Sequence, residues 1–195
     1  MSFNKVFQIL YSIYINRGNA KQELNDLKGS IDDYNLAIKV DLSPSKTIQR
    51  LAKLRGLPLP NHALAYFNRG NSYTLLEDYK AAFEDCSKAI ELTPNMLFIG
   101  TKAELYKKLG LYREAIKYFN IVLELQPNSE DVITQIRECC TELGIDETQV
   151  KYHSTRDNES TELINRFHKT LSIATAEYTP RNINIPSIIN KRLEK

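Results

Sequence analysis

The sequence predicts an all-α fold, built as a stack of antiparallel helix pairs, and three observations support this fold class. The chain of 195 residues has only seven glycines and seven prolines, a composition that suits helices and disfavours an all-β protein. Hydrophobic residues make up 42% of the chain and charged residues 26%, which is enough for an ordinary soluble core. Two segments also repeat one another, because NRGN opens both residues 16–38 and residues 68–90, and Asp-x-x-x-Ala-Ile closes both.

The same pattern of small and aromatic residues recurs along the chain at fixed offsets. The first copy has Gly18, Lys21, Ser30, Tyr34, Ala37 and Leu42, the second has Gly70, Tyr73, Ala82, Cys86, Ala89 and Pro94, and the third has Ala103, Tyr106, Ala115, Phe119, Val122 and Pro127. We therefore predict clear units at about 11–42, 63–95 and 96–128, followed by a degenerate fourth unit at 130–156.

Each unit is predicted to be a pair of packed helices. In the second unit the first helix is expected from about His62 to Leu76 and the second from about Tyr79 to Leu92. Gly70 and Ala82 are small where these helices cross, so the two backbones can approach closely. Pro94 ends the second helix because proline has no N–H to donate. One such pair cannot bury its own apolar face, so several pairs must stack.

The repeated units resemble tetratricopeptide repeats (TPRs), a family of helix–turn–helix units about 34 residues long. The resemblance runs from about Tyr11 to His153 and is best in the second and third units. It implies an α-solenoid, a TPR-like superhelix of antiparallel helix pairs. In the fourth unit Arg137 and Gln149 stand where small residues belong, so we expect this unit to form a polar end of the array.

Residues 43–60, SPSKTIQRLAKLRGLPLP, form an insert between the first two units. They carry Lys46, Arg50, Lys53 and Arg55 and no acidic residue, and apolar residues recur among these cations at three-residue spacing. A short basic amphipathic helix is therefore expected. This helix either packs on the flank of the first two units or serves as a docking element for an acidic partner.

A last helix is predicted at 159–178, with Leu163, Phe167 and Leu171 on one face. We expect it to act as a C-terminal capping helix over the exposed edge of the array, which completes a repeat domain at 1–178. Residues 179–195 contain two prolines and several asparagines and are expected to form an irregular tail.

Composition disfavours several partners and compartments. The formal net charge is only +2, which argues against a nucleic-acid-coating protein, since that role needs a clear positive excess. The apolar run at residues 6–15 is too short to span a bilayer, so we predict no membrane partner. The cysteines are Cys86, Cys139 and Cys140, an odd number with two adjacent, which favours a reducing compartment and hence the cytoplasm.

Motifs for catalysis, metal binding or cofactor binding are missing from the sequence. It has no phosphate-binding glycine loop, no H-E-x-x-H and no C-x-x-C. The adjacent Cys139 and Cys140 fall on a predicted helix, where their side chains diverge by about 100° and cannot easily share one metal ion. We therefore predict a protein that is not an enzyme and needs no cofactor.

The family resemblance implies that the first helices of the units, the A helices, line a concave groove that holds a peptide. Asparagine offers both a donor and an acceptor, so it can read a peptide backbone without demanding a particular side-chain sequence. The alternative, that some asparagines cap turns or bond neighbouring helices, stays open. The candidate groove residues are Asn16, Asn19, Leu64, Phe67, Asn68, Asn71, Thr101, Glu104 and Lys108.

One subclass of the family binds chaperone C-termini through two asparagines and three cations. Asn19 and Asn68 match the asparagine positions here, but Ile15, Leu97 and Thr101 occupy the cation positions. A carboxylate would then lack its charge-assisted partners. A co-chaperone role is therefore a minor alternative.

These observations lead to a functional hypothesis, namely a non-enzymatic adaptor or scaffold that binds a protein or peptide segment in its groove. The alternative is a structural subunit of a larger assembly, docking through the insert and the outer face. An RNA-binding repeat is disfavoured, because such a protein needs a basic face on every unit. The partner's identity and the oligomeric state stay open at this point.

Overall fold

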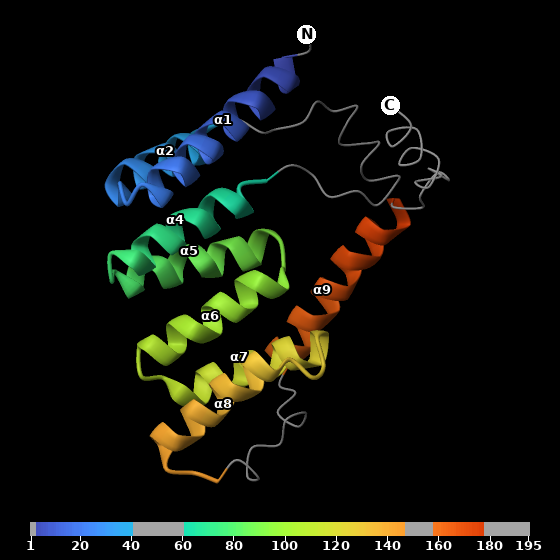
Figure 1. The fold of residues 1–195 in the computed structure, drawn as a ribbon. Coiled ribbons are helices and arrows are strands. Elements are labelled where there is room, and N and C mark those ends of the chain that lie inside the picture. The colour runs from blue at the N-terminus through green and yellow to red at the C-terminus, as the bar shows by residue number, and fades with distance from the viewer. Residues whose placement is uncertain (1–2, 41–60, 147–157, 178–195) are drawn as a thin grey trace, which may run out of the picture.

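The computed structural model describes residues 3–40, 61–146 and 158–177, and every regular element in these ranges is an α-helix. The all-α solenoid expected from the sequence is thus confirmed. Figure 1 shows the helix pairs stacked in chain order, with α9 running along one side of the stack. The helices are α1 (Phe3–Glu23), α2 (Leu27–Lys39), α4 (Ala63–Leu75), α5 (Tyr79–Leu92), α6 (Met96–Lys108), α7 (Tyr112–Leu125), α8 (Glu130–Leu143) and α9 (Asn158–Glu177).

Helices α1, α4, α6 and α8 are the A helices, and all four end in the same kind of left-handed turn. Asn25, Glu77, Gly110 and Gly144 have φ between 61° and 73°. The next backbone N–H then donates to a carbonyl near the end of the A helix, over 2.8 to 3.1 Å. In the first two units an aspartate follows the turn and caps the second helix, with Asp78 Oδ1 accepting from Ala81 N at 3.2 Å.

The two helices of a pair cross closely, as the small residues predict. A Cβ atom added at Gly70 would lie only 3.2 Å from the carbonyl oxygen of Ala82 on the opposing helix. By contrast, the nearest atom to a Cβ added at Gly100 is a Val122 methyl group at 3.9 Å. A side chain at Gly70 would therefore push α4 and α5 apart, whereas Gly100 has room for one.

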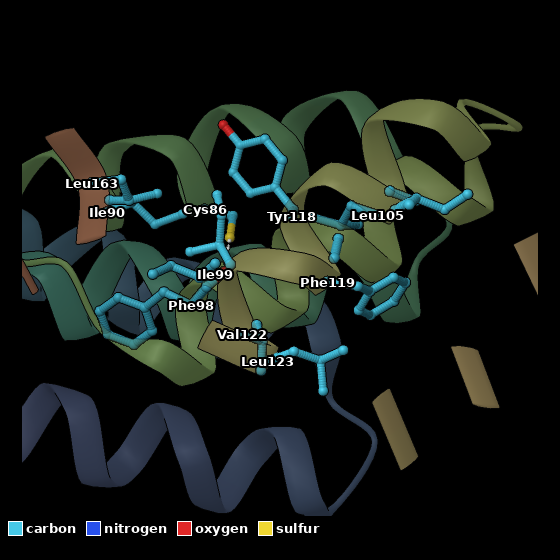
Figure 2. Close-up of a cluster of buried hydrophobic side chains, with 14 of the residues drawn as sticks. Cys86, Ile90, Phe98, Ile99, Leu105, Tyr118, Phe119, Val122, Leu123 and Leu163 are labelled. Carbon is cyan, nitrogen blue, oxygen red and sulfur yellow. Dashed lines mark hydrogen bonds between the residues drawn. The ribbon is translucent and has the colours of Figure 1, made fainter. Parts of the chain in front are cut away.

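Two hydrophobic clusters hold the stack together. The larger cluster runs from α4 to α8 and includes Leu163 of α9, which Figure 2 shows beside Ile90 and Cys86. The smaller cluster joins the first pair to α4 and consists of Ile15, Tyr34, Ala37 and Ala65. The side chains at one repeat position, Tyr34, Cys86 and Phe119, are all buried, so the repeat register of the sequence correctly identifies core positions.

A bidentate ion pair joins the two helices of the first and second units. Arg17 donates from Nε and Nη2 to the carboxylate of Asp33 at 2.8 and 2.5 Å, and Arg69 does the same to Asp85 at 2.7 and 2.6 Å. Arg69 also donates to Asn35 Oδ1 at 2.6 Å, which ties α4 to α2 of the preceding unit. The two arginine–aspartate ion pairs therefore join the helices within each unit, and the hydrogen bond from Arg69 to Asn35 joins the second unit to the first.

The third unit replaces this ion pair with a lysine and a tyrosine. Lys102 and Tyr118 stand at the equivalent positions, and Lys102 Nζ lies 4.9 Å from the centre of the Tyr118 ring. A carboxylate reaches this unit from α9, because Glu159 accepts from the Tyr118 hydroxyl and from Lys117 Nζ, each at 2.9 Å. These two hydrogen bonds lower the pKa of the Glu159 carboxyl.

Helix α9 packs against the side of the stack. Besides its contacts with α7, Arg166 donates to the carbonyl oxygens of Ile90 and Glu91 at 3.3 and 2.7 Å, where α5 ends and leaves carbonyls unpaired. The sequence suggests a cap over the edge of the array, whereas the structure uses α9 as a brace along α5 and α7. The insert 43–60, the tail 179–195 and residues 147–156 of the predicted fourth unit lie outside the described residues.

Replacing Gly70 by valine is expected to destabilise the fold by about 1–3 kcal/mol, because the new side chain overpacks the crossing of α4 and α5. The control is Gly100→Ala, expected to stabilise α6 by about 0.5–1 kcal/mol, since alanine is the better helix former. Urea unfolding followed by circular dichroism measures both variants. Similar effects of the two changes would contradict the close crossing.

The Asp33 carboxyl is expected to make stability depend on acid pH. The hydrogen bond from Arg17, followed by contacts with Lys21, lowers the pKa of Asp33 in the folded state. The resulting stabilisation is present above the unfolded pKa, about 4, and is lost as the pH falls through the lower folded value. Wild-type protein should therefore lose stability more steeply below about pH 4 than Asp33→Asn.

At neutral pH we expect Asp33→Asn to destabilise the fold by about 1–3 kcal/mol, because a buried carboxylate that accepts charged hydrogen bonds is lost. The neighbouring Asp32 is exposed, so Asp32→Asn is the matched control and should change stability by less than about 0.5 kcal/mol. Urea unfolding across the acid range measures all three proteins. Parallel pH profiles for wild type and Asp33→Asn would refute this assignment.

Candidate functional site

Equivalent positions on α1, α4 and α6 form three rows across the stack, and we call the surface they make the A-helix face. Residues four apart on a helix lie on one side of it, so each helix contributes in register. The first row holds the exposed Leu64 and Leu97, with 46% and 62% of their surface accessible. The second row holds Asn16, Asn68 and Thr101, and the third holds Asn19, Asn71 and Glu104.

Asn19 and Asn68 form an amide pair that bridges α1 and α4. Asn68 Nδ2 donates to Asn19 Oδ1 at 2.8 Å, and the Tyr34 hydroxyl donates to the same oxygen at 2.8 Å. The Tyr34 hydroxyl also lies 3.0 Å from Gln22 Oε1. The sequence leaves open whether these asparagines read a peptide or bond neighbouring helices. Asn19 and Asn68 bond neighbouring helices.

Asn16 and Asn71 differ from the amide pair, because their side chains make no hydrogen bond within the described ranges. Asn16 is exposed and Asn71 is half-buried. Their amide groups therefore keep full donor and acceptor capacity.

The sequence predicts Phe67 as a groove residue, and this prediction is wrong. Only 6% of its surface is accessible, and its ring stacks on Phe98 of α6 with the ring centres 4.4 Å apart. An apolar ring at the margin of the face is more stable between the repeats than in water, and Phe98 supplies its partner. Phe67 thus belongs to the core and is not available to a peptide.

An open pocket of about 560 Å³ lies where α6 and α8 face each other. Two predicted site residues, Glu104 and Lys108, line it. The α8 residues that line this pocket are not among the predicted groove residues, although the repeat register, extended into the degenerate fourth unit, indicates their positions. The full lining is Glu104, Lys107, Lys108, Tyr112, Gln135, Glu138, Thr141 and Glu142.

The lysines of this pocket already have contacts within the chain. Lys107 Nζ donates to Gln135 Oε1 at 2.7 Å and forms an ion pair with Glu138. Lys108 is exposed, and its Nζ lies 5.8 Å from the centre of the Tyr79 ring. With three glutamates against two lysines, the lining carries a slight negative excess.

Lys102, close to the face in sequence, points away from it. Its Nζ lies 4.9 Å from the ring centres of Phe83 and Tyr118 and 5.9 Å from that of Tyr106. Burial among these rings lowers the pKa of Lys102. Lys102 therefore serves the packing of α5, α6 and α7.

All three cysteines are buried in the core, and burial makes Cys86 and Cys139 poorly reactive. Burial raises the pKa of Cys86 to about 12, and its Sγ donates to the carbonyl oxygen of Phe98 at 3.2 Å. Burial also raises the pKa of Cys139, and both Cys139 and Cys140 are buried. Because the thiolate is the nucleophile and metal ligand, the two thiols with raised pKa values stay protonated and unreactive at neutral pH.

Two further sequence predictions concern the basic insert and membrane association. The candidate docking residues Lys46, Arg50, Lys53 and Arg55 lie outside the described residues. Across the helices that the structure does describe, none combines the length and apolar character required to cross a bilayer.

The repeats match known families and proteins. Family models of the tetratricopeptide repeat match residues 11–44, 63–96 and 99–129, about half of the chain. Sperm-associated antigen 1 of Mus musculus is 35% identical over 69 residues, which are 35% of this chain and 8% of that protein. Serine/threonine-protein phosphatase 5 of Rattus norvegicus is 31% identical over 81 residues, which are 41% of this chain and 16% of that protein. The chain thus corresponds to a small part of the length of these relatives.

Solved structures share the same architecture. The first TPR of Spaghetti (RPAP3), bound to the HSP90 peptide SRMEEVD, has a TM-score of 0.54 at 20% identity and covers 69% of this chain and 95% of that chain. YrrB, a TPR protein with an unusual peptide-binding site, has a TM-score of 0.53 at 19% identity and covers 86% and 78%. At such identities the likeness shows the fold alone. The family models and the stacked helix pairs together show that this chain belongs to the tetratricopeptide repeat family.

Proposed function

We propose that the protein is a non-enzymatic, cytoplasmic adaptor that binds a segment of a partner protein on its A-helix face. The observation that carries the proposal is the exposed pair Leu64 and Leu97, which stand at equivalent positions of successive A helices beside a row of polar side chains. Exposed apolar residues that gather in one place, next to hydrogen-bonding groups, are typical of interaction surfaces.

The comparisons support binding of a protein segment in general terms. TPR proteins with solved structures include one bound to an HSP90 peptide and one with an unusual peptide-binding site. Together with the repeat architecture, these relatives favour an adaptor that presents a rigid surface to a peptide.

Binding of an acidic chaperone tail is the less favoured version of this function. Of the three positions where such binders carry cations, Ile15 is buried, with 4% of its surface accessible, and Leu97 and Thr101 are uncharged. A terminal carboxylate at this place would find no charged hydrogen-bond donor. The other alternative, a structural subunit that docks through its insert, depends on residues 43–60 outside the described ranges.

The proposal predicts that peptides selected from a random display library bind the purified protein through the A-helix face. The double variant Leu64→Glu, Leu97→Glu should bind the selected peptides at least about tenfold more weakly, because charges replace the apolar row and lose its contacts. Both positions are exposed, so stability should change by less than about 0.5 kcal/mol per site. Fluorescence anisotropy measures binding, and urea unfolding measures stability.

The matched control is Leu36→Glu on α2, a leucine with 38% of its surface accessible that lies away from the A-helix face. This control should bind like wild type. Equal binding by the double variant, or equal loss in the control, would remove the A-helix face from the function.

A further inference from the structure

Helix α1 carries an apolar stripe on the side that faces away from the core. Val6, Ile9 and Ile13 have 49%, 44% and 51% of their surface accessible, and Leu10 is half-buried. Because successive residues of a helix are rotated by about 100°, these four side chains fall on one side of α1, opposite the buried Ile15. We call these four residues the α1 stripe.

In the later repeats the same side of the A helix packs on the preceding unit. Ala65 of α4 stands at the repeat position of Ile13, and it is buried in the small cluster among side chains of the first pair. The α6 equivalent, Phe98, is also buried and stacks on Phe67 of α4. The α1 stripe is therefore a stacking surface at the end of the array, where no described unit precedes it (Figure 1).

The stripe lies in an uncharged stretch of the helix. Residues 6–16 contain no charged side chain. Ser12 Oγ donates to the backbone carbonyl of Gln8 at 2.9 Å, and the next cation along the helix, Arg17, is bound to Asp33. The ends of solenoids are ordinarily polar, and contiguous exposed apolar residues are typical of interaction surfaces. Two copies of this surface can meet without burying an unpaired charge.

The α1 stripe is complementary to itself. In an antiparallel pair with two-fold symmetry, Val6 of one copy faces Ile13 of the other, and Ile9 faces Leu10, because the stripe is centred between Ile9 and Leu10. Each apolar side chain of the stripe then meets an apolar side chain of the second copy. The antiparallel direction also opposes the two helix dipoles, whereas a parallel pair would align them.

The far end of the stack offers the stripe a poorer partner surface. Head-to-tail stacking of copies would bring the exposed charges of α8 towards the apolar side chains and remove water from them at a cost. These exposed charged residues of α8 are Glu130, Asp131, Arg137, Glu138 and Glu142.

We infer that the α1 stripe joins two copies of this chain in an antiparallel pair with two-fold symmetry. The apolar surface that the stripe exposes is on the order of 300 Å² per copy, below the roughly 800 Å² per partner of a standard interface. The dimer is therefore weak, with a Kd on the order of 10–100 µM.

Sedimentation equilibrium of the full chain, from about 1 µM to about 1 mM, tests the pairing. Wild-type protein should show a monomer–dimer equilibrium. The double variant Ile9→Glu, Ile13→Glu should raise the Kd at least about tenfold, because the pair would bury charges without partners. The matched control is Leu76→Glu, Leu111→Glu, two leucines of the inter-helix turns with 42% and 46% of their surface accessible, and it should dimerise like wild type. Circular dichroism checks that each variant is folded.

Disulfide cross-linking tests the antiparallel register. The native cysteines Cys86, Cys139 and Cys140 are buried and do not compete. A mixture of Val6→Cys and Ile13→Cys chains should cross-link on mild oxidation, because these positions face each other. Neither variant alone should cross-link, since the two copies of one cysteine would lie about 10 Å apart along the helix axis.

Four results would overturn the inference. A monomer at every concentration would mean that residues 43–60 of the same chain cover the stripe or that water does. A series of growing oligomers would indicate head-to-tail stacking, and cross-linking of either single cysteine variant with itself would indicate a parallel pair. Undiminished dimerisation of the Ile9→Glu, Ile13→Glu variant would place the interface elsewhere.

Discussion

The close crossing of the two helices in each repeat is the constraint on which the rest of the structure depends. Because Gly70 has no side chain, α4 and α5 approach until the position of a Cβ would lie 3.2 Å from the Ala82 carbonyl oxygen. At that separation Arg69 of α4 donates two hydrogen bonds to Asp85 of α5. It donates a third to Asn35 of α2, in the preceding unit. The hydrogen bond to Asn35 fixes the second helix pair against the first, so equivalent residues of the A helices α1 and α4 lie in register.

The fold was largely predictable from sequence because its determinants are local and periodic. Small residues at fixed offsets indicate helix pairs, and the shared position of Tyr34, Cys86 and Phe119 indicates burial. Phe67 was misplaced because its environment depends on Phe98, which belongs to the next unit and approaches only after stacking. The bond between Asn19 and Asn68 depends on stacking in the same way, since the two residues are far apart in sequence.

The docking of α9 shows how a substitution in one repeat can be compensated from outside the array. Lys102 and Tyr118 occupy the places that an arginine and an aspartate hold in the preceding unit, so the third unit lacks a carboxylate at the aspartate position. Glu159 of α9 supplies one to Tyr118, and Leu163 fills the adjoining apolar surface. Sequence alone reveals the missing aspartate, but it does not reveal that a distant helix replaces it.

The small cluster that joins the first pair to α4 has a consequence for cooperativity. In a linear array each repeat is stabilised only by its neighbours, and the region with the fewest buried apolar contacts opens first. Four buried residues hold this end, against a far larger cluster along the remaining helices. Fraying of α1 and α2 would separate Asn19 from Asn68 and so disrupt the A-helix face. A segment bound to this face would therefore oppose local unfolding of the first repeat and slow its amide hydrogen exchange.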